Sequence, residues 1–330
     1  MKHTLILLAA LLATALVAAS FTRPARAASP AAEASARLLA QIEPRIKAIY
    51  EGDEFPIRSF TANWLPDGSG YLKMETPRGA SVPEVACYDA ASGKRTVVVP
   101  SEKLVVPGTS RPIKLSWFQP APSGKLFLLH GEVTQGERRS GHWLYEIDSG
   151  ALRPLDDGPG LWFDGNAFSP DGQRLVATRG EDLVVLEIAG GRTIPLTKDG
   201  RPDAVDNSHR ASWSPDGRWM AYIQTDSSAV PKRPILVPGD PTYRGFREQR
   251  YERIGGPIST FRIGVVSVEG GSTRWIELAD KPGTFYLGQV SWAGNSDELL
   301  VEKLSRSRDA REFLLVNHRT GAIAKAYAET

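Results

Sequence analysis

The 330-residue chain has a single cysteine, Cys87, and only 5 histidines. One cysteine excludes an internal disulfide and any zinc site built from several cysteines. An excess of charge of one sign is also lacking, because 40 Lys and Arg face 38 Asp and Glu. The resulting net charge of +2 is too balanced to indicate a nucleic-acid partner. With 41% hydrophobic and 24% charged residues, the composition is that of a globular chain long enough to bury a large core.

A long hydrophobic run occurs only at the N-terminus. The run over residues 5–19 is rich in Leu and Ala, and it is shorter than the roughly 20 residues of a membrane span. It follows a short basic start and precedes an Ala-Arg-Ala motif, which predicts a signal peptide over residues 1–27, cleaved between Ala27 and Ala28. An uncleaved anchor is the alternative. Cleavage would change the net charge from +2 to −1, because the segment has three basic residues and no acid. We therefore expect secretion, to the periplasm in a Gram-negative bacterium, with no membrane attachment afterwards.

The next segment, residues 28–52, is predicted to form a helical lead-in. Apolar residues recur there at helical spacing, which indicates a helix from Ala32 to Tyr50 with an interruption near Pro44. From residue 53 to residue 330, short β-rich runs alternate with clusters of Gly, Pro, Asp and Ser. We expect this part to be one β-structured region.

One phrase recurs along this region: an aromatic residue followed by a Pro-Asp-Gly turn or a degenerate form of it. The five copies read WLPDG, WFQPAPSG, FSPDG, WSPDG and WAGNS. Their aromatic residues, which we call the blade anchors, are 53, 51, 45 and 79 residues apart. The five anchors are Trp64, Trp117, Phe168, Trp213 and Trp292.

The chemistry of the phrase predicts its structure. Pro sets φ at the second turn position, Asp accepts a hydrogen bond from backbone downstream, and Gly takes the positive φ. The aromatic residue would end a strand and pack between neighbouring sheets. A unit of roughly 45–50 residues is one four-stranded sheet that must stack on others to bury its faces. The sequence therefore predicts an all-β protein, a β-propeller with about five four-stranded blades. A β-sandwich pair is the alternative, but it gives no reason for the phrase to recur.

The unit that starts at Trp213 contains an insertion over residues 227–262. This stretch is rich in Pro, Lys, Arg and aromatic residues, and it is flanked by good strands, so we expect it to lie within a blade. Basic residues interleaved with aromatics could indicate a nucleic-acid or acidic ligand. We favour a solvated loop that packs its aromatics on the rim of the propeller, and we expect no nucleic-acid partner.

Motifs for catalysis are missing from the chain. No Gly-x-Ser-x-Gly motif occurs, and no pair of histidines has the spacing of a zinc peptidase. The stretch from Asp199 to Asp206 resembles a calcium loop only superficially, because the terminal Glu is missing. We expect a structural or surface role for His130, His142, His209 and His318. No catalytic, cofactor-binding or metal-binding residue is predicted, and no cofactor is expected.

Several segments resemble a known family. FTANWLPDGSGYLKMETPRG, NAFSPDGQRLVATRGEDLVVLEIAGG, SHRASWSPDGRWMAYIQTD and RYERIGGPISTFRIGVVSVEGGSTRWIEL are similar to the N-terminal propeller of bacterial dipeptidyl peptidase IV-like serine peptidases, in the prolyl oligopeptidase group. The resemblance covers about residues 34–330. It implies an eight-bladed propeller that roofs the active site and filters substrates by size. It also implies a C-terminal α/β-hydrolase domain with a Ser-Asp-His triad.

The chain departs from that pattern in two ways. Five repeats and no hydrolase motif indicate a chain truncated before the hydrolase domain and an incomplete ring, whose open edges could self-associate. The Glu pair that holds a substrate's amino terminus in the family has no counterpart, because the sequence contains no Glu-Glu dipeptide. We expect a non-catalytic propeller portion that takes part in proteolysis by substrate gating. Its partners would be peptides or a hydrolase domain encoded elsewhere. The alternative is a free-standing periplasmic, TolB-like propeller that serves as a binding or scaffold module.

Overall fold

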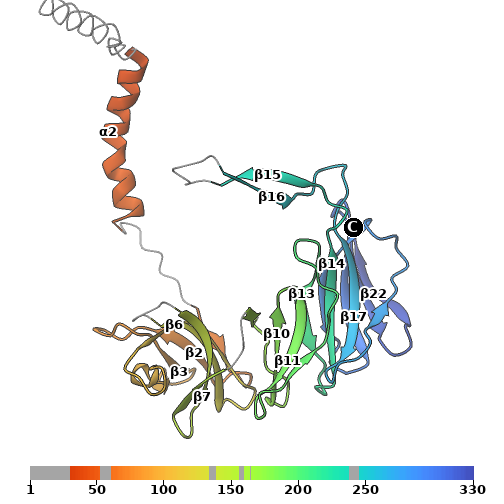
Figure 1. Ribbon diagram of the computed structural model, residues 1–330, viewed down its shortest axis with the longest axis horizontal. Helices are drawn as coiled ribbons and strands as arrows, with labels where there is room; N and C mark the ends of the chain where they lie inside the picture. Colours follow the sequence, from red (N-terminus) through yellow and green to blue (C-terminus); the bar gives the residue numbers. More distant parts are fainter. Residues whose placement is uncertain (1–29, 53–60, 134–138, 156–159, 164, 238–244) are drawn as a thin grey trace, which may run out of the picture. The chain divides into compact units, whose positions relative to one another are not determined.

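A computed structural model of the chain (Figure 1) divides it into two compact units, Met1–Thr61 and Ala62–Thr330. The predicted signal peptide and its cleavage site at Ala27 and Ala28 lie outside the described residues. The structure describes residues 30–52, 61–133, 139–155, 160–163, 165–237 and 245–330.

The first unit contains the helix α2, Pro30–Tyr50. The helix runs through Pro44 without a break, so the predicted interruption is wrong. Proline removes one N–H donor, and the turns on either side continue across this gap. An ion pair between Glu43 and Lys47, 2.8 Å apart, spans the proline at the favourable (i, i+4) spacing. Within the described part of the chain, no helix has the length and apolar character needed to cross a membrane.

The second unit consists mainly of five four-stranded antiparallel sheets, which we call blades 1 to 5 in chain order. In blades 1, 2, 3 and 5, four consecutive strands pair in chain order. Blade 1 comprises β1 (Asn63–Trp64), β2 (Gly70–Glu75), β3 (Glu84–Asp89) and β4 (Arg95–Val99), and blade 2 comprises β5 (Ile113–Pro120), β6 (Leu126–Val133), β7 (Arg139–Glu146) and β8 (Ala151–Pro154). A short 3₁₀ helix, Ser101–Lys103, connects the two blades.

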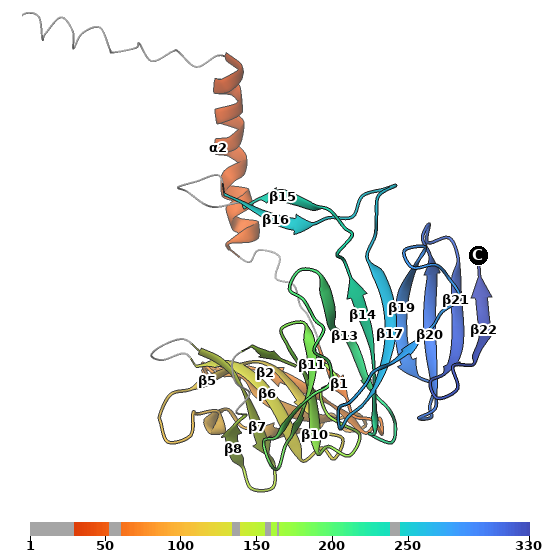
Figure 2. The same ribbon diagram turned by 45° about the vertical axis from the view of Figure 1, so that its right-hand side comes forward.

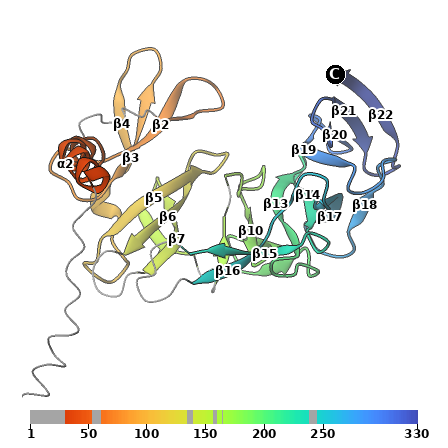
Figure 3. The same ribbon diagram turned by 90° about the horizontal axis from the view of Figure 1, so that it is seen from above.

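The other three blades follow in the same way, and Figure 3 shows the sheets in sequence order along the second unit. The predicted five four-stranded blades are thus confirmed. Blade 3 comprises β9 (Leu161–Trp162), β10 (Arg174–Arg179), β11 (Asp182–Glu187) and β12 (Thr193–Pro195); blade 4 comprises β13 (Val205–Trp213), β14 (Trp219–Asp226), β17 (Thr260–Ser267) and β18 (Arg274–Ile276); and blade 5 comprises β19 (Phe285–Trp292), β20 (Glu298–Ser305), β21 (Arg311–Asn317) and β22 (Ile323–Glu329).

Blade 4 carries the insertion. Between its paired strands β14 and β17 the chain forms a separate two-stranded hairpin of β15 (Lys232–Leu236) and β16 (Phe246–Arg250), which extends beyond the end of the blade in Figures 1 and 2. The insertion therefore lies within a blade, as predicted. Its aromatics do not all pack on the rim, because Phe246 and Tyr251 are 64% and 54% exposed.

The hydrophobic core is divided into four clusters, each between two consecutive blades. Neighbouring residues of one strand serve different clusters: Leu128 packs toward blade 3 and Leu129 toward blade 1. Val184 and Val185 divide in the same way between blades 2 and 4. Successive side chains of a strand point to opposite faces of the sheet. Blades 2, 3 and 4 are therefore each buried on both faces. This stacking is the packing of a β-propeller.

The repeated phrase forms the turn that its chemistry predicts. In all five copies of the phrase, the glycine has a positive φ. Gly172 and Gly217, for example, both have φ 70°. The Asp before each of these glycines accepts a hydrogen bond from the backbone N–H two residues on, from Gln173 to Asp171 at 3.0 Å and from Arg218 to Asp216 at 3.1 Å. Such turns connect the first and second strands of a blade.

Most of the blade anchors lie between sheets. The Nε1–H of Trp213 donates to the carbonyl oxygen of Ala167 in blade 3 at 3.1 Å, and that of Trp292 donates to Ser212 in blade 4 at 3.0 Å. Phe168 and Trp117 belong to the cluster between blades 2 and 3. Trp64 differs, because it is 64% exposed and contacts Tyr71 of its own blade.

Candidate functional site

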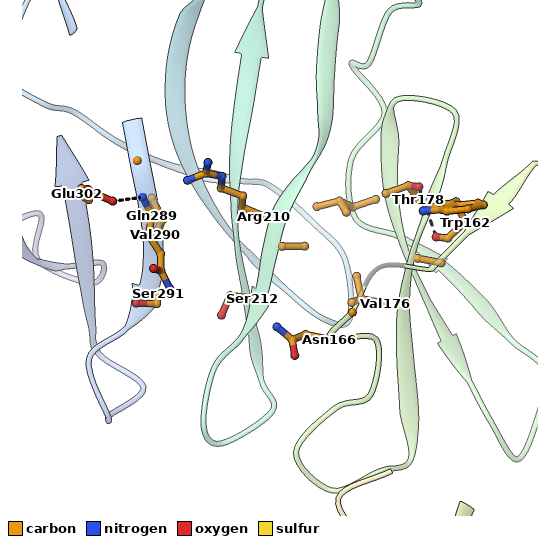
Figure 4. A pocket seen from close by; sticks show the side chains of 15 residues that line it. Trp162, Asn166, Val176, Thr178, Arg210, Ser212, Gln289, Val290, Ser291 and Glu302 are labelled. Atoms are coloured by element: carbon orange, nitrogen blue, oxygen red, sulfur yellow. Dashed lines mark hydrogen bonds between the residues drawn. The ribbon is translucent and has the colours of Figure 1, made fainter. Parts of the chain in front are cut away.

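The first strands of three consecutive blades line a cavity of about 640 Å³. These strands are β9, β13 and β19, and strands β10, β11 and β20 also contribute to the walls. Figure 4 shows the polar side chains that surround it, and those of Arg210 and Glu302 are charged. The volume is within the usual range for ligand sites in proteins. The cavity is therefore the candidate functional site.

Arg210, on the cavity wall formed by β13, has an unusual backbone conformation. Its φ is 60°, in the left-handed region that residues other than Gly, Asn and Asp rarely enter, and such a conformation costs about 1–3 kcal/mol. The pairing of β13 with β14 shifts register twice nearby, between Asp206 and His209 and between His209 and Ser212. Such bulges change the direction in which a side chain points. The bulge thus accounts for an arginine on a strand wall that faces the cavity.

A second bulge shapes the opposite wall. The pairing of β19 with β20 shifts register between Leu287 and Val290, and the backbone N–H of Gln289 donates to the Glu302 carboxylate at 3.0 Å. Gly288 lies against this carboxylate, and a Cβ on it would displace the end of the Glu302 side chain. Arg311 forms an ion pair with the same carboxylate, with Nε 3.1 Å from Oε1. The charge of Glu302 is therefore compensated within the protein.

Trp162 presents a flat aromatic surface in the cavity wall. Its side chain is 61% exposed, and its ring meets the ring of His130 edge-on, with centroids 5.9 Å apart. His130 in turn lies 4.7 Å from the ring of His142, its direct partner in the pairing of β6 with β7. The Ser116 hydroxyl is 2.9 Å from His130 Nδ1. Two of the four histidines thus lie side by side, which their sequence positions did not suggest.

His318 is a core residue between blades 4 and 5. It is fully buried, with the rings of Trp219 and Trp292 at 5.2 and 5.4 Å. Its Nε2 lies 3.1 Å from the carbonyl oxygen of Ser296 and so donates to it, while Nδ1 has no hydrogen-bond partner among the described residues. Burial lowers the pKa of His318 below 6.5, and the positive charges of Arg319 and Arg274 lower it further.

We expect this histidine to make the protein sensitive to mild acid. Below the ordinary histidine pKa of 6.5 the unfolded chain binds a proton that the folded chain resists, so the free energy of unfolding falls as the pH decreases. Replacing His318 with glutamine, which keeps a donor for Ser296, should flatten this dependence. Urea unfolding of both proteins between pH 7.5 and 5.5 measures it. If the free energy of unfolding falls equally steeply with decreasing pH in both proteins, the prediction is contradicted. The paired carboxylates of Glu75 and Glu312 do not interfere, because their pKa values are near 2 and their contributions are lost at lower pH.

In the stretch that resembles a calcium loop, Asp199 to Asp206, the first carboxylate accepts hydrogen bonds from protein side chains. The Asp199 carboxylate accepts from the side-chain amides of Asn207 at 2.9 Å and Gln224 at 2.8 Å. Among the described residues, no group of three or more His, Cys, Asp or Glu side chains could hold a metal ion. The carboxylate of Asp199 therefore takes part in a network that connects blades 3 and 4.

Sequence reasoning named no residue of this cavity. Arg210 and Glu302 belong to no motif, and the register shifts that direct Arg210 toward the cavity are not encoded by a local residue type. Trp162 offered one weak signal, since it is a tryptophan outside the repeated phrase. Gly288 offered another, as a glycine within an otherwise strand-like run.

The fold and the cavity define a propeller whose first strands surround a polar ligand-sized site, and comparisons with known proteins identify its family. The model of the dipeptidyl peptidase IV N-terminal region matches residues 122–330. The chain belongs to this family, as the sequence resemblance indicated.

Individual relatives agree with the family match. The chain is 24% identical over 337 residues to "Probable dipeptidyl-aminopeptidase B" of Aspergillus terreus, an alignment that covers 89% of this chain and 36% of the relative. It is 26% identical over 298 residues to the protein of the same name from Emericella nidulans, covering 79% and 32%. The crystal structure of dipeptidyl peptidase 4 of Porphyromonas gingivalis matches with a TM-score of 0.73 and 22% identity over 86% of this chain and 42% of that one. The chain thus spans about a third of the length of these curated relatives.

Proposed function

We propose that this chain is the non-catalytic propeller region of a secreted dipeptidyl peptidase IV-like serine peptidase and that it gates the access of peptides. The observation that supports this role most directly is the cavity bounded by the first strands of blades 3, 4 and 5. In a propeller these strands surround the axis, so the cavity lies on the route that a peptide entering along the axis would take. Because the chain belongs to the dipeptidyl peptidase IV N-terminal family, the reaction to which this gating would contribute is the hydrolysis of peptides.

The walls of the cavity suit a peptide. Trp162 offers an exposed aromatic face for a side chain, and Asn166, Ser212 and Ser291 offer neutral polar groups to the peptide backbone. On this proposal the nucleophile comes from a hydrolase domain, and the propeller region contributes selection by size and by contact.

The exposed tryptophan provides a test of peptide admission. Replacing Trp162 with alanine is expected to weaken the binding of the peptide Ala-Pro-Ala-Ala-amide, which has no carboxylate, by about tenfold, because an aromatic contact worth about 1.4 kcal/mol is lost. Isothermal titration calorimetry on the purified chain measures the change. Trp64 is the matched control, since it is equally exposed on the first strand of blade 1 but does not line the cavity.

Two results would contradict the proposal. If the Trp64→Ala and Trp162→Ala substitutions weaken peptide binding equally, the cavity is not the site at which peptides bind. Turnover of chromogenic Xaa-Pro peptides by the purified chain, if it survives the removal of contaminating peptidases, would show that the region is itself catalytic.

A further inference from the structure

Arg210 provides the cavity with a positive charge that no described residue compensates. Among the described residues it has no ion pair and no side-chain hydrogen bond. The acid on the opposite wall, Glu302, is occupied by Arg311 and by the backbone N–H of Gln289. The Arg210 side chain is exposed and lines the cavity, as Figure 4 shows. A ligand that enters the cavity therefore meets an available guanidinium group.

The conformation of Arg210 argues that this placement is specific. The residue lies within the second register shift of β13, between His209 and Ser212, and has a left-handed backbone. An arginine gains nothing locally from this conformation, since glycine or asparagine would adopt it with less strain. Strained backbone of this kind is concentrated at binding and catalytic sites.

The chemistry of the guanidinium group indicates its ligand. Its planar donors match a carboxylate through two parallel hydrogen bonds. A doubly charged phosphate usually needs several cations or a helix N-terminus, whereas the cavity wall contains one arginine and the acid Glu302. We propose that Arg210 anchors a carboxylate-binding site, which takes an acidic side chain or the terminal carboxylate of a peptide. The peptide part of this inference rests on the proposed function of the chain.

Three short peptides and one amino-acid derivative test the site. Acetyl-Ala-Glu-Ala-amide carries only a side-chain carboxylate, acetyl-Ala-Gln-Ala with a free C-terminus carries only a terminal one, and acetyl-Ala-Gln-Ala-amide carries none. N-acetylglutamate presents carboxylates without a peptide. Calorimetry on the full chain should show at least one carboxylate peptide binding about tenfold more tightly than the neutral one, as expected for a charge-assisted hydrogen bond. The preferred peptide identifies the source of the carboxylate.

Variants of the arginine locate the effect. Arg210→Gln and Arg210→Gly should both abolish the tenfold preference. Glycine also accepts the left-handed backbone, so loss in that variant cannot be attributed to strain. Arg210→Lys should keep a reduced preference, because it retains the charge without the planar fork. Arg218→Gln is the matched control, since Arg218 is exposed in the turn before β14 and does not line the cavity. It should leave binding unchanged.

The possible failures are distinguishable. If the neutral peptide binds as tightly as the carboxylate peptides and depends on Trp162, the carboxylate site is refuted while peptide admission stands. If N-acetylglutamate binds in an Arg210-dependent manner and no peptide binds, the carboxylate site stands while peptide admission fails. An equal effect of Arg210→Gln and Arg218→Gln refutes the site, because general electrostatic attraction then explains the preference.

Discussion

Replacing Trp213 with alanine is expected to lower the free energy of unfolding by about 3–5 kcal/mol, the usual effect of truncating a buried aromatic residue. The indole is only 9% exposed and packs in the cluster between blades 3 and 4. Truncation would also remove the hydrogen bond from its Nε1 to the carbonyl oxygen of Ala167. Both losses affect the contact between two blades, so the whole second unit should become less stable.

Chemical denaturation followed by circular dichroism measures this effect, and two variants make it specific. Trp213→Phe keeps most of the apolar contact and loses the hydrogen bond, so it should lie between the wild type and the alanine variant. Trp64→Ala should change stability by less than about 1 kcal/mol, because Trp64 is exposed. If the two alanine variants are equally destabilised, the anchor at Trp213 does not hold the blades together.

The second large effect is expected from Asn207→Leu, which should lower the free energy of unfolding by about 3 kcal/mol. Asn207 is fully buried. Its Nδ2 donates to the carboxylates of Asp182 and Asp199, both at 2.9 Å, and its Oδ1 accepts from Gln224 at 2.9 Å. Leucine has a similar size but removes all three of these hydrogen bonds, two of which are to carboxylates.

A matched pair of variants separates the network from general sensitivity to substitution. Asn63→Ala changes an exposed asparagine of β1 and should alter stability by no more than about 0.5 kcal/mol. Asn207→Asp places a third carboxylate beside Asp182 and Asp199 and should destabilise the protein at neutral pH at least as much as leucine does. An Asn207→Leu protein as stable as the wild type would show that the network contributes little.

The carboxylate site would give this propeller region a selectivity different from recognition of an amino terminus. Arg210, which has no ion pair with a described residue, attracts anionic groups to the cavity, and the sequence contains no Glu-Glu dipeptide. We therefore expect peptides with a carboxylate near the residue held at Arg210 to be admitted in preference to neutral ones. The calorimetric comparison described above decides this point.

The blade architecture could be predicted from the sequence because its signals are local. A Pro-Asp-Gly turn forms from the preferences of its own residues, so the positive φ of Gly172 and Gly217 and the five blades follow from a repeated phrase. The continuous apolar run Leu183–Leu186 of β11 is likewise a local pattern, typical of a strand that is buried on both faces. The continuity of α2 through Pro44 could not be predicted in this way, because neighbouring turns compensate for the missing donor.

Only the tertiary structure determined the cavity and its charges. The direction of Arg210 depends on two register shifts between β13 and β14, and the pairing of His130 with His142 depends on the register of β6 with β7. The position of Trp162 beside them depends on how blade 3 packs on blade 2. Register and packing result from contacts among residues far apart in the chain, so no local pattern encodes them. The sequence by itself therefore determined the repeated blade and the family, whereas the stacking of the blades determined which side chains meet in the cavity.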